Sequence, residues 1–456
     1  MLLDDPRSDL GGDARRKRTW TISPQLWAAA LIAAVVATLV ALQIVASCKG
    51  FEGPLHSLWE DFAGTPKSVS VPWAGLALAL VGLSWRRRFI TLGVAIAVDA
   101  VCALIRILSG GPMTVGNGAV IALTGLALVA WLGWEGTEKR NALRAAALGT
   151  LLILATKIGD VWLHFTVMAG PNVRDRYVVL ADHAFGEPSW VMGRVIDALG
   201  PVVYGVLHWV YIELPVAAMV VAAWQLRKVV ATGVWPGHYL VRTFLVLGLL
   251  GPVVYLMFPV VGPMFAYGPD GHGLQIGNYW PHIVPPLDHH PTPLPFDTAT
   301  PRNCMPSMHT AWATAVFLHT RRDTDGGPAP RWLRWGGAFW LLATLAATLG
   351  FGYHYGADLL AGAVLALTIE SVLRAPGRGW DRGRIAVVAA GFGLLFGLLL
   401  SYRYLAVRMA EYPLPAGIIA LGLFAGFASA FHYTWFARRA DEPAAVPVPV
   451  GESPRT

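Results

Sequence analysis

The sequence predicts an all-α protein, a polytopic bundle of about twelve transmembrane helices. Two observations carry this prediction. Of the 456 residues, 55% are hydrophobic and only 14% are charged, whereas about 25% of the residues of an ordinary soluble domain are charged. Uncharged apolar runs also recur along the whole chain, which is typical of helices embedded in lipid rather than of one large soluble core.

The predicted spans are apolar runs of roughly eighteen residues, some of them shorter. The first follows the basic residues Arg15 to Arg18, but it is longer than the apolar region of a secretory signal, so we expect it to be retained. In order, the spans lie near 26–47, 72–85, 89–108, 115–134, 145–168, 201–224, 240–258, 306–320, 336–352, 355–373, 385–402 and 415–437.

Basic residues set the predicted orientation. Clusters such as Arg86-Arg87-Arg88, Lys139-Arg140 and Arg227-Lys228 fall on one side of the spans, together with the N-terminal cluster. The positive-inside rule assigns that side to the cytoplasm, with both termini there. This distribution accounts for the net charge of +7 without nucleic acid, since no polar face interleaves aromatic and basic residues. We therefore expect a multi-pass protein of the cell membrane.

Two loops on the predicted outer side are long, from about 169 to 200 and from 259 to 306. Loops of this length are usually functional or disordered. The second loop is rich in proline and contains irregularly spaced histidines, for which a solvated loop is expected rather than a metal site: His272, His282, His289 and His290. The predicted orientation allows Cys48 and Cys304 to face the outside together, so a disulfide between them is conceivable and requires their Cα atoms to lie close together.

The strongest local signal is the segment from Arg302 to Trp312, which contains Pro306-Ser307-Met308-His309. Proline is favourable just inside a helix start, because its missing N–H has no partner there in any case. Ser307 can cap the first turn, whose free N–H groups attract anions. His309 would lie in that turn, where the positive end of the helix dipole favours phosphate.

The second signal is His354-Tyr-Gly-Ala-Asp358. The i, i+4 spacing places both side chains on one helix face. A carboxylate there can hold one imidazole nitrogen and leave the other as a nucleophile or base. The alternative is a polar pair that satisfies itself between helices. The span count favours a site, because it brings His309, His354 and Asp358 to the same outer surface, where ionisable residues at membrane depth mark function.

These motifs resemble those of the type 2 phosphatidic acid phosphatase superfamily. Pro306-Ser307-Met308-His309 is similar to its Pro-Ser-x-His motif, and His354 to Asp358 is similar to its closing His-x3-Asp motif. One branch of this superfamily, the inositol phosphorylceramide synthases, consists of inositolphosphotransferases. Three segments further resemble this branch: 303–312, 258–263 and 181–188. The resemblance covers roughly residues 145–375 and implies a six-helix phosphatase-like core.

The resemblance also implies roles for these residues. His354 would attack phosphorus to form a phosphohistidine, Asp358 would orient His354, and His309 would protonate the leaving oxygen and then deprotonate the acceptor. An imidazole suits this proton transfer because its ordinary pKa lies near neutrality. No metal or other cofactor is implied.

The family's phosphate-binding lysine and arginine have no clear counterpart here, since Met264 and Thr348 stand where arginine is expected. Arginine is the best bidentate donor to phosphate. Arg302 is the substitute we predict, with Ser307 beside it as a second substrate-binding residue. Other basic residues of the outer loops are weaker candidates: Arg174, Arg176 and Arg194.

Lys157, Asp160 and His164 lie on one face in the outer half of a predicted span. They form either an internal salt-bridged cluster, which is the favoured interpretation, or part of the substrate-binding cavity. Both interpretations remain open from the sequence.

The predicted organisation has five parts. They are a cytoplasmic segment (1–25), an N-terminal transmembrane region of unknown role (26–140), the phosphatase-like catalytic core (141–375), C-terminal transmembrane helices (376–439) and a disordered cytoplasmic tail (440–456).

Three functions follow from these features. The leading hypothesis is a lipid phosphotransferase that moves a phospho-headgroup, with phosphoinositol as the favoured case, from a phospholipid donor to a hydroxylated lipid or glycolipid acceptor. The alternative is a lipid phosphate phosphatase, a hydrolase with the same site. A transporter or flippase is a third hypothesis, which the absence of paired inverted halves disfavours.

Overall fold

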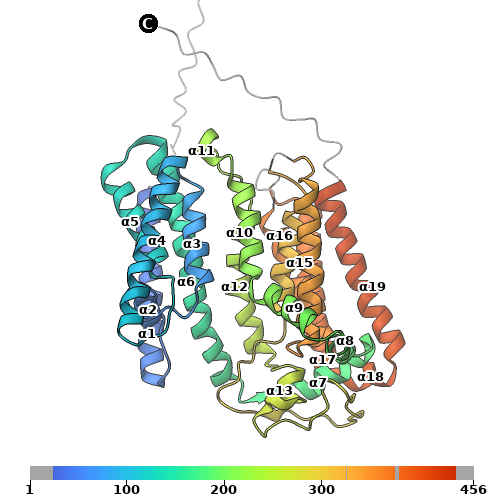
Figure 1. Cartoon of the computed structure of the whole chain (residues 1–456). Helices are drawn as coiled ribbons and strands as arrows, with labels where there is room; N and C mark the ends of the chain where they lie inside the picture. The colour runs from blue at the N-terminus through green and yellow to red at the C-terminus, as the bar shows by residue number, and fades with distance from the viewer. Residues whose placement is uncertain (1–23, 325, 375–378, 438–456) are drawn as a thin grey trace, which may run out of the picture.

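The computed structural model describes residues 24–324, 326–374 and 379–437. The predicted cytoplasmic tail at 440–456, and the predicted N-terminal segment up to residue 23, lie outside the described residues. Figure 1 shows the described part as a bundle of helices whose axes are roughly aligned. Irregular segments and short helices gather at one end of the bundle.

The N-terminal third is a bundle of its own, on the left of Figure 1. Its helices are α1 (Pro24–Lys49), α2 (Pro54–Phe62), α3 (Ser70–Leu80), α4 (Trp85–Leu108), α5 (Asn117–Gly133) and α6 (Gly136–Ala169). Helices α3 and α6 cross closely at Gly149 and Gly75. A Cβ atom on Gly149 would lie only 2.1 Å from the carbonyl oxygen of Gly75. Only glycine permits this approach of two backbones.

The remaining helices form the larger bundle. It contains β1 (Asn172–Val173), α7 (Asp175–Asp182), η1 (His183–Phe185), α8 (Pro188–Leu199), α9 (Pro201–Ile212), α10 (Leu214–Leu226), α11 (Val229–Thr232), α12 (Leu240–Met257), α13 (Pro263–Ala266), η2 (Pro269–Gly271), β2 (Leu294–Pro295), α14 (Met308–His319), α15 (Arg331–Gly350), α16 (Gly356–Leu373), α17 (Arg382–Tyr404), α18 (Ala406–Glu411), α19 (Pro413–His432) and a π-helical turn, Tyr433–Ala437. Strands β1 and β2 pair antiparallel and tie the two long loops together.

The all-α membrane fold is confirmed. Among the described residues, eight helices are long and apolar enough to cross a membrane, and α3, α5 and α9 are shorter apolar helices. Each of the predicted spans overlaps a helix, but the total of about twelve stays a prediction.

One predicted span is wrong in its continuity. The range 201–224 is two helices, α9 and α10, separated at Glu213. Pro215 explains the break, because proline lacks the N–H that a continuous helix needs and its ring clashes with the carbonyl one turn earlier. The loop predicted at 169–200 is also largely helical, since it contains α7 and α8.

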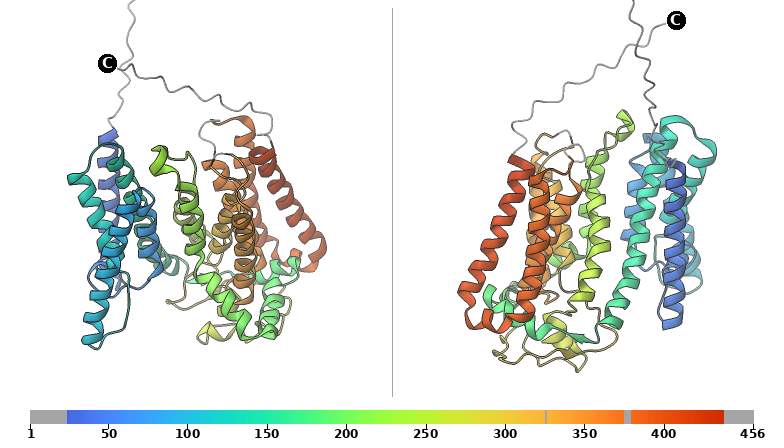
Figure 2. Two further views of the ribbon diagram at one scale, coloured as in Figure 1. Left: turned by 45° about the horizontal axis from the view of Figure 1, so that its top comes forward. Right: turned by 180° about the vertical axis from the view of Figure 1, so that it is seen from behind.

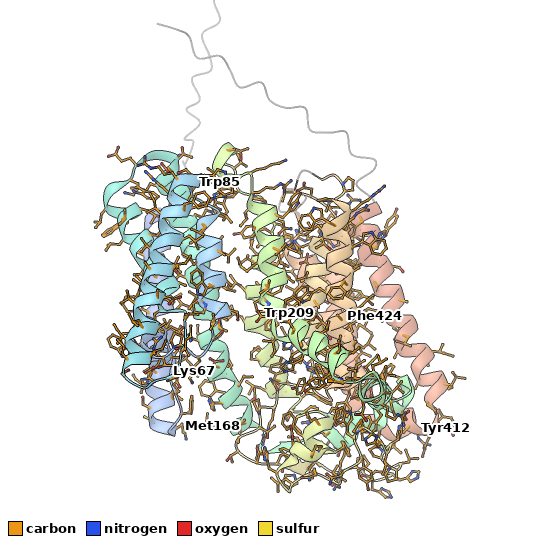
Figure 3. The ribbon with its side chains drawn as sticks, in the orientation of Figure 1. Lys67, Trp85, Met168, Trp209, Tyr412 and Phe424 are labelled. Atoms are coloured by element: carbon orange, nitrogen blue, oxygen red, sulfur yellow. The ribbon has the colours of Figure 1, made fainter. Side chains whose placement is uncertain are left out.

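The basic cluster after Trp85 and the two long loops lie at opposite ends of the bundle. Figure 3 shows Trp85, which precedes Arg86-Arg87-Arg88, at one end of the bundle, and Met168 and Tyr412 toward the opposite end. The segments after Met168 contain the two long loops, which lie at that second end around α7 and α13 (Figure 1). Which end faces the cytoplasm stays a prediction.

Candidate active site

The first histidine motif forms the start of α14. Ser307 is the N-cap residue, and its hydroxyl accepts a hydrogen bond from the backbone N–H of Thr310 at 3.3 Å. This is the cap that the sequence indicates. In this first turn, the ring of His309 stacks on Tyr211 of α9, with 3.9 Å between centroids and 15° between planes. The stacking fixes the orientation of the imidazole in the lining of a cavity.

The second motif lies in the turn between α15 and α16. The backbone N–H of His354 donates to the carbonyl oxygen of Thr348 at 3.2 Å, which holds the turn against the end of α15. Nδ1 of His354 is 3.6 Å from Oδ2 of Asp358, just beyond hydrogen-bond distance. Burial lowers the pKa of His354 from 6.5 to about 4, because the charged imidazolium loses its hydration. The imidazole is therefore neutral at physiological pH.

Cys304 is a member of this site that the sequence analysis missed. Its thiol donates to Oδ2 of Asp358 at 2.7 Å and lies 3.5 Å from Nδ1 of His354. Cys304 is buried and Cys48 is exposed. Both thiols are free, so the disulfide between them does not form. The available signal was its position two residues before Pro306, which places it beside the same helix start.

Two buried carboxylates hold the surrounding backbone. Asp175 accepts hydrogen bonds from the N–H groups of Val261 and Gly262, at 3.1 and 2.9 Å, and from the hydroxyl of Tyr355 at 2.9 Å. Asp182 accepts from the N–H of Ala357 at 2.9 Å, in the first turn of α16. Burial raises the pKa of each of these aspartates to about 7. Asp175 thus holds Tyr355, which follows His354, and Asp182 holds the first turn of α16, which carries Asp358. Neither aspartate lines the cavity itself.

The histidines face a cavity of about 590 Å³, which His309, His354 and Tyr211 line at one end. Its volume is within the range of small-molecule and cofactor sites. The rest of its lining is dominated by aliphatic and aromatic side chains from α3, α6, α10 and α12, and no lysine or arginine among the described residues lines it. A molecule that fills it must be largely apolar.

Arg302 does not face this cavity. Its side chain is fully buried, with Nε donating to the carbonyl oxygen of Gly170 at 2.9 Å and the terminal nitrogens donating to the carbonyl oxygens of Thr300 and Asp297. The guanidinium thus joins the end of α6 to the loop before α14. In this structure its donors are occupied by protein acceptors instead of being open to a phosphate.

Lys157, Asp160 and His164 separate into three environments. Nζ of Lys157 is 2.7 Å from Oδ2 of Asp61 on α2, and both side chains are buried. The ring of His164 stacks on Phe51 at 4.5 Å between centroids, away from the cavity. Asp160 alone lines the cavity that contains the two histidines.

The other basic candidates also lie outside the cavity lining. Arg174 packs its guanidinium over the ring of Phe258, and Arg176 donates to Thr292 at 3.1 Å. Arg194 is exposed on α8. The loop histidines do not gather either, since His282 lies beside Asp197 and His289 beside Glu411.

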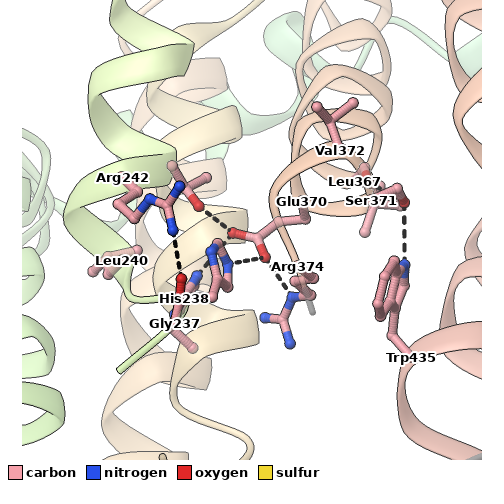
Figure 4. A network of polar contacts seen from close by, with 12 residues as sticks. Gly237, His238, Leu240, Arg242, Leu367, Glu370, Ser371, Val372, Arg374 and Trp435 are labelled. Atoms are coloured by element: carbon pink, nitrogen blue, oxygen red, sulfur yellow. Dashed lines mark hydrogen bonds and ion pairs between the residues drawn. The ribbon is translucent and has the colours of Figure 1, made fainter. Parts of the chain in front are cut away.

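A second polar cluster lies at the opposite ends of α14 and α16 (Figure 4). Glu370 is its centre, with His319 at 2.8 Å, Thr243 at 2.6 Å, His238 at 3.1 Å and Arg374 at 2.5 Å from its carboxylate oxygens. Its two histidines and the glutamate are close enough to share a cation, as are Cys304, His354 and Asp358. In the Glu370 cluster, Arg374 already neutralises the carboxylate.

The fold and the site define a helical membrane protein with two histidines that line an apolar cavity and a buried aspartate beside the second histidine. Comparison with known families agrees: residues 188–371 match the PAP2 superfamily, and this range contains all three residues. Residues 25–165 match a domain of unknown function, DUF5933. No curated protein and no solved structure matches the chain.

Residues 188–371 are thus similar to the PAP2 superfamily, and this match supports an enzyme of the phosphatase or phosphotransferase type. The match begins at residue 188, later than the resemblance that the motifs suggest at about 145. The boundary predicted between residues 140 and 141 falls inside α6 and stays a prediction.

Proposed function

We propose that this protein is a lipid phosphotransferase, in which His309, His354 and Asp358 move a phospho-headgroup from a phospholipid to a hydroxylated lipid or glycolipid. Phosphoinositol is the headgroup that the sequence around His309, residues 303–312, favours through its resemblance to inositolphosphotransferases. The observation that carries transfer over hydrolysis is the apolar lining of the cavity that both histidines face. A site that excludes water protects a phosphoenzyme from hydrolysis and leaves a lipid hydroxyl as its acceptor.

The first step is attack by His354. Its Nδ1 lies toward Asp358 and Cys304, so Nε2 is the nucleophile that forms the new N–P bond. The P–O bond to the diacylglycerol oxygen breaks, and His309, whose protonated form the negative charge of the bound phosphate favours, gives its proton to that oxygen. The carboxylate of Asp358 stabilises the positive charge that develops on the His354 ring.

The second step reverses the proton transfer. Neutral His309 takes the proton of the acceptor hydroxyl, whose oxygen attacks phosphorus as the N–P bond breaks. His354 is regenerated and the headgroup leaves on the acceptor. Helices α14 and α16 both begin at the site, so the positive ends of two helix dipoles support the phosphate charge where the arginines of the family pattern are missing.

The same proposal includes orientation. The site lies at the starts of α14 and α16. The positive-inside rule, applied to the basic loops of the chain, gives an extracytoplasmic active site and cytoplasmic termini in the cell membrane.

The test is incubation of the purified protein with phosphatidylinositol labelled in its headgroup and a set of lipid acceptors. We expect a labelled acceptor product, an acid-labile phosphoenzyme, and loss of both in His354→Ala. Release of water-soluble headgroup phosphate with no lipid product would establish the phosphatase alternative instead. Full activity in both His309→Ala and His354→Ala would remove the whole assignment.

A further inference from the structure

One wall of the cavity that the two histidines line comes from the N-terminal bundle. Helix α6 contributes side chains at successive positions of one face: Leu152, Ala155, Thr156, Gly159, Asp160 and Leu163. Their spacing of three and four residues is that of one stripe along a helix. Helix α3 adds Val71, Ala74 and Leu78. The region that matches a domain of unknown function therefore faces the histidines of the PAP2 domain.

The two bundles are joined at both ends of this wall. At the end near α11, a hydrophobic cluster that includes Leu78, Leu148, Leu226 and Tyr239 fills the space between them. At the other end, Arg302 binds the carbonyl oxygen of Gly170. Between these contacts α3 and α6 face α10 and α12 across the cavity, as the ribbons in Figures 1 and 2 are arranged.

The length of the wall matches one leaflet of a membrane. Leu152 and Leu163 are eleven residues apart on α6, which is roughly 16 Å at 1.5 Å per residue. The hydrocarbon core of a bilayer is about 30 Å thick, so one leaflet is about half of that. Hydrocarbon chains of a lipid whose headgroup lies at the histidines would run along this wall.

Small residues keep the wall open. A Cβ atom built on Gly159 meets no atom within 4 Å, so its backbone borders empty space rather than a neighbouring helix. A glycine in a helix interior destabilises the helix relative to alanine, and packing against another helix does not explain this one.

Asp160 is the charged residue on this wall, whereas the hydroxyl of Thr156 donates to the carbonyl oxygen of Leu152 in its own helix. Its carboxylate is exposed to the cavity, and no described residue is hydrogen-bonded or ion-paired with it. Lys157, one turn earlier on α6, acts on this carboxylate through its charge but forms its ion pair with Asp61. A carboxylate without a hydrogen bond at membrane depth is costly and marks function. Carboxylates accept hydrogen bonds strongly from hydroxyl groups.

We propose that α3 and α6 form the substrate-binding wall against which the hydrocarbon chains of the lipid substrates lie, and that Asp160 accepts a hydrogen bond from the hydroxyl of the acceptor lipid. This inference rests on the proposed function. It gives the N-terminal region a direct part in substrate binding, and it makes Asp160 a residue that selects a hydroxylated lipid over water.

A binding experiment tests the wall without turnover. Phosphatidylinositol with a photoactivatable group in its acyl chain is irradiated with the full-length His354→Ala protein in lipid nanodiscs. We expect labelled peptides from α3 and α6, and we expect Gly159→Phe in the same background to reduce labelling of α6 about tenfold, since its ring occupies the chain site. Labelling confined to other helices, or unchanged by Gly159→Phe, would overturn the proposal.

A matched control is Gly125→Phe on α5. Gly125 also has open space around its Cβ position, but it does not line the cavity. It should leave labelling unchanged, and in the protein with His354 intact it should leave activity unchanged. Gly159→Phe should lower the ratio of kcat/KM for dioleoyl over dibutyryl phosphatidylinositol about tenfold. Thermal unfolding of both variants in detergent identifies any loss of folding.

Asp160 is tested by the partition between products. With Asp160→Leu we expect the ratio of lipid transfer to phosphate release to fall about tenfold, and with Asp160→Asn, which keeps an acceptor oxygen, to fall less. An unchanged ratio would remove Asp160 from acceptor binding. If the wild-type protein acts on no lipid, the proposed function fails, whereas the photolabelling result still decides whether the wall binds lipid chains.

Discussion

The backbone N–H of Ser307 donates to the backbone carbonyl oxygen of Asp358 at 3.0 Å, so the segments that carry the two histidine motifs are hydrogen-bonded to each other. The contact is close on both sides. A Cβ atom on Gly362, one turn further along α16, would lie 2.3 Å from the carbonyl oxygen of Ser307. His309 and His354 are therefore held by one rigid junction between α14 and α16, which favours catalysis by preorganised groups.

The thiol of Cys304 supports this junction by donating to Asp358. We predict that Cys304→Ala lowers kcat about fivefold, because the loss of one hydrogen bond from a weak thiol donor, worth about 1 kcal/mol, frees the carboxylate to turn from His354. Cys304→Ser keeps a donor and should retain most of the activity. The measurement is kcat and KM for the lipid donor in both variants, with KM unchanged.

A role for Cys304 as a packing residue only would give a different result. In that case alanine and serine would affect thermal stability without separating in kcat, and the pH dependence of kcat would be the same in both variants.

Arg302 is predicted to act on stability more than on phosphate binding. Its guanidinium bonds three backbone carbonyl oxygens, of Gly170, Thr300 and Asp297. The single ammonium of Arg302→Lys cannot reach all three, and each buried acceptor left unpaired costs about 1–3 kcal/mol. We expect a lower Tm in detergent, with KM for the donor changed much less. A large rise in KM at unchanged Tm would instead restore the phosphate-binding role that the sequence suggests.

The sequence could predict the cap at Ser307 and the proximity of His354 to Asp358, because both features are encoded within a few residues; the catalytic role of the triad stays a prediction. Contacts between distant segments are not encoded in this way. Arg302 could not be distinguished from a phosphate ligand, since Gly170 comes from another helix. The ion pair of Lys157 was expected within its own helix face, but its partner is Asp61 on α2. The break at Glu213 was visible in Pro215, and the apolar run concealed it.

The pKa of Asp182 leads to a prediction on pH. Burial raises this pKa from 3.8 to about 7, so between about pH 4 and pH 7 the folded protein keeps a proton that the unfolded chain releases. The contribution of Asp182 to the free energy of unfolding is fully present below pH 4 and is lost as the pH rises through 7. At 1.36 kcal/mol per pKa unit the loss is at most about 4 kcal/mol.

Asp182→Asn provides the comparison, because its amide keeps an acceptor for the N–H of Ala357 and cannot titrate. We expect the Tm of the wild-type protein to fall relative to that of the variant between pH 4.5 and pH 7.5. Asp175, whose pKa is raised in the same direction, is present in both proteins and cancels in this difference. A difference in Tm that does not change with pH would show that Asp182 is ionised throughout.

The ion pair between Lys157 and Asp61 gives the last prediction, on stability. Both side chains are buried, with 6% and 1% of their surface exposed, and Nζ lies 2.7 Å from Oδ2. Lys157→Met keeps the volume of the lysine stem but leaves a buried carboxylate unpaired, which should destabilise the protein by about 3–5 kcal/mol. The double variant Lys157→Met/Asp61→Asn removes the unpaired charge and should recover much of that loss.

The matched control is Lys67→Met, since Lys67 pairs with Glu52 but is 58% exposed, and a surface pair is worth about 1 kcal/mol or less. Thermal unfolding in detergent ranks the variants, and equal effects of Lys157→Met and Lys67→Met would contradict a buried pair that joins α2 to α6.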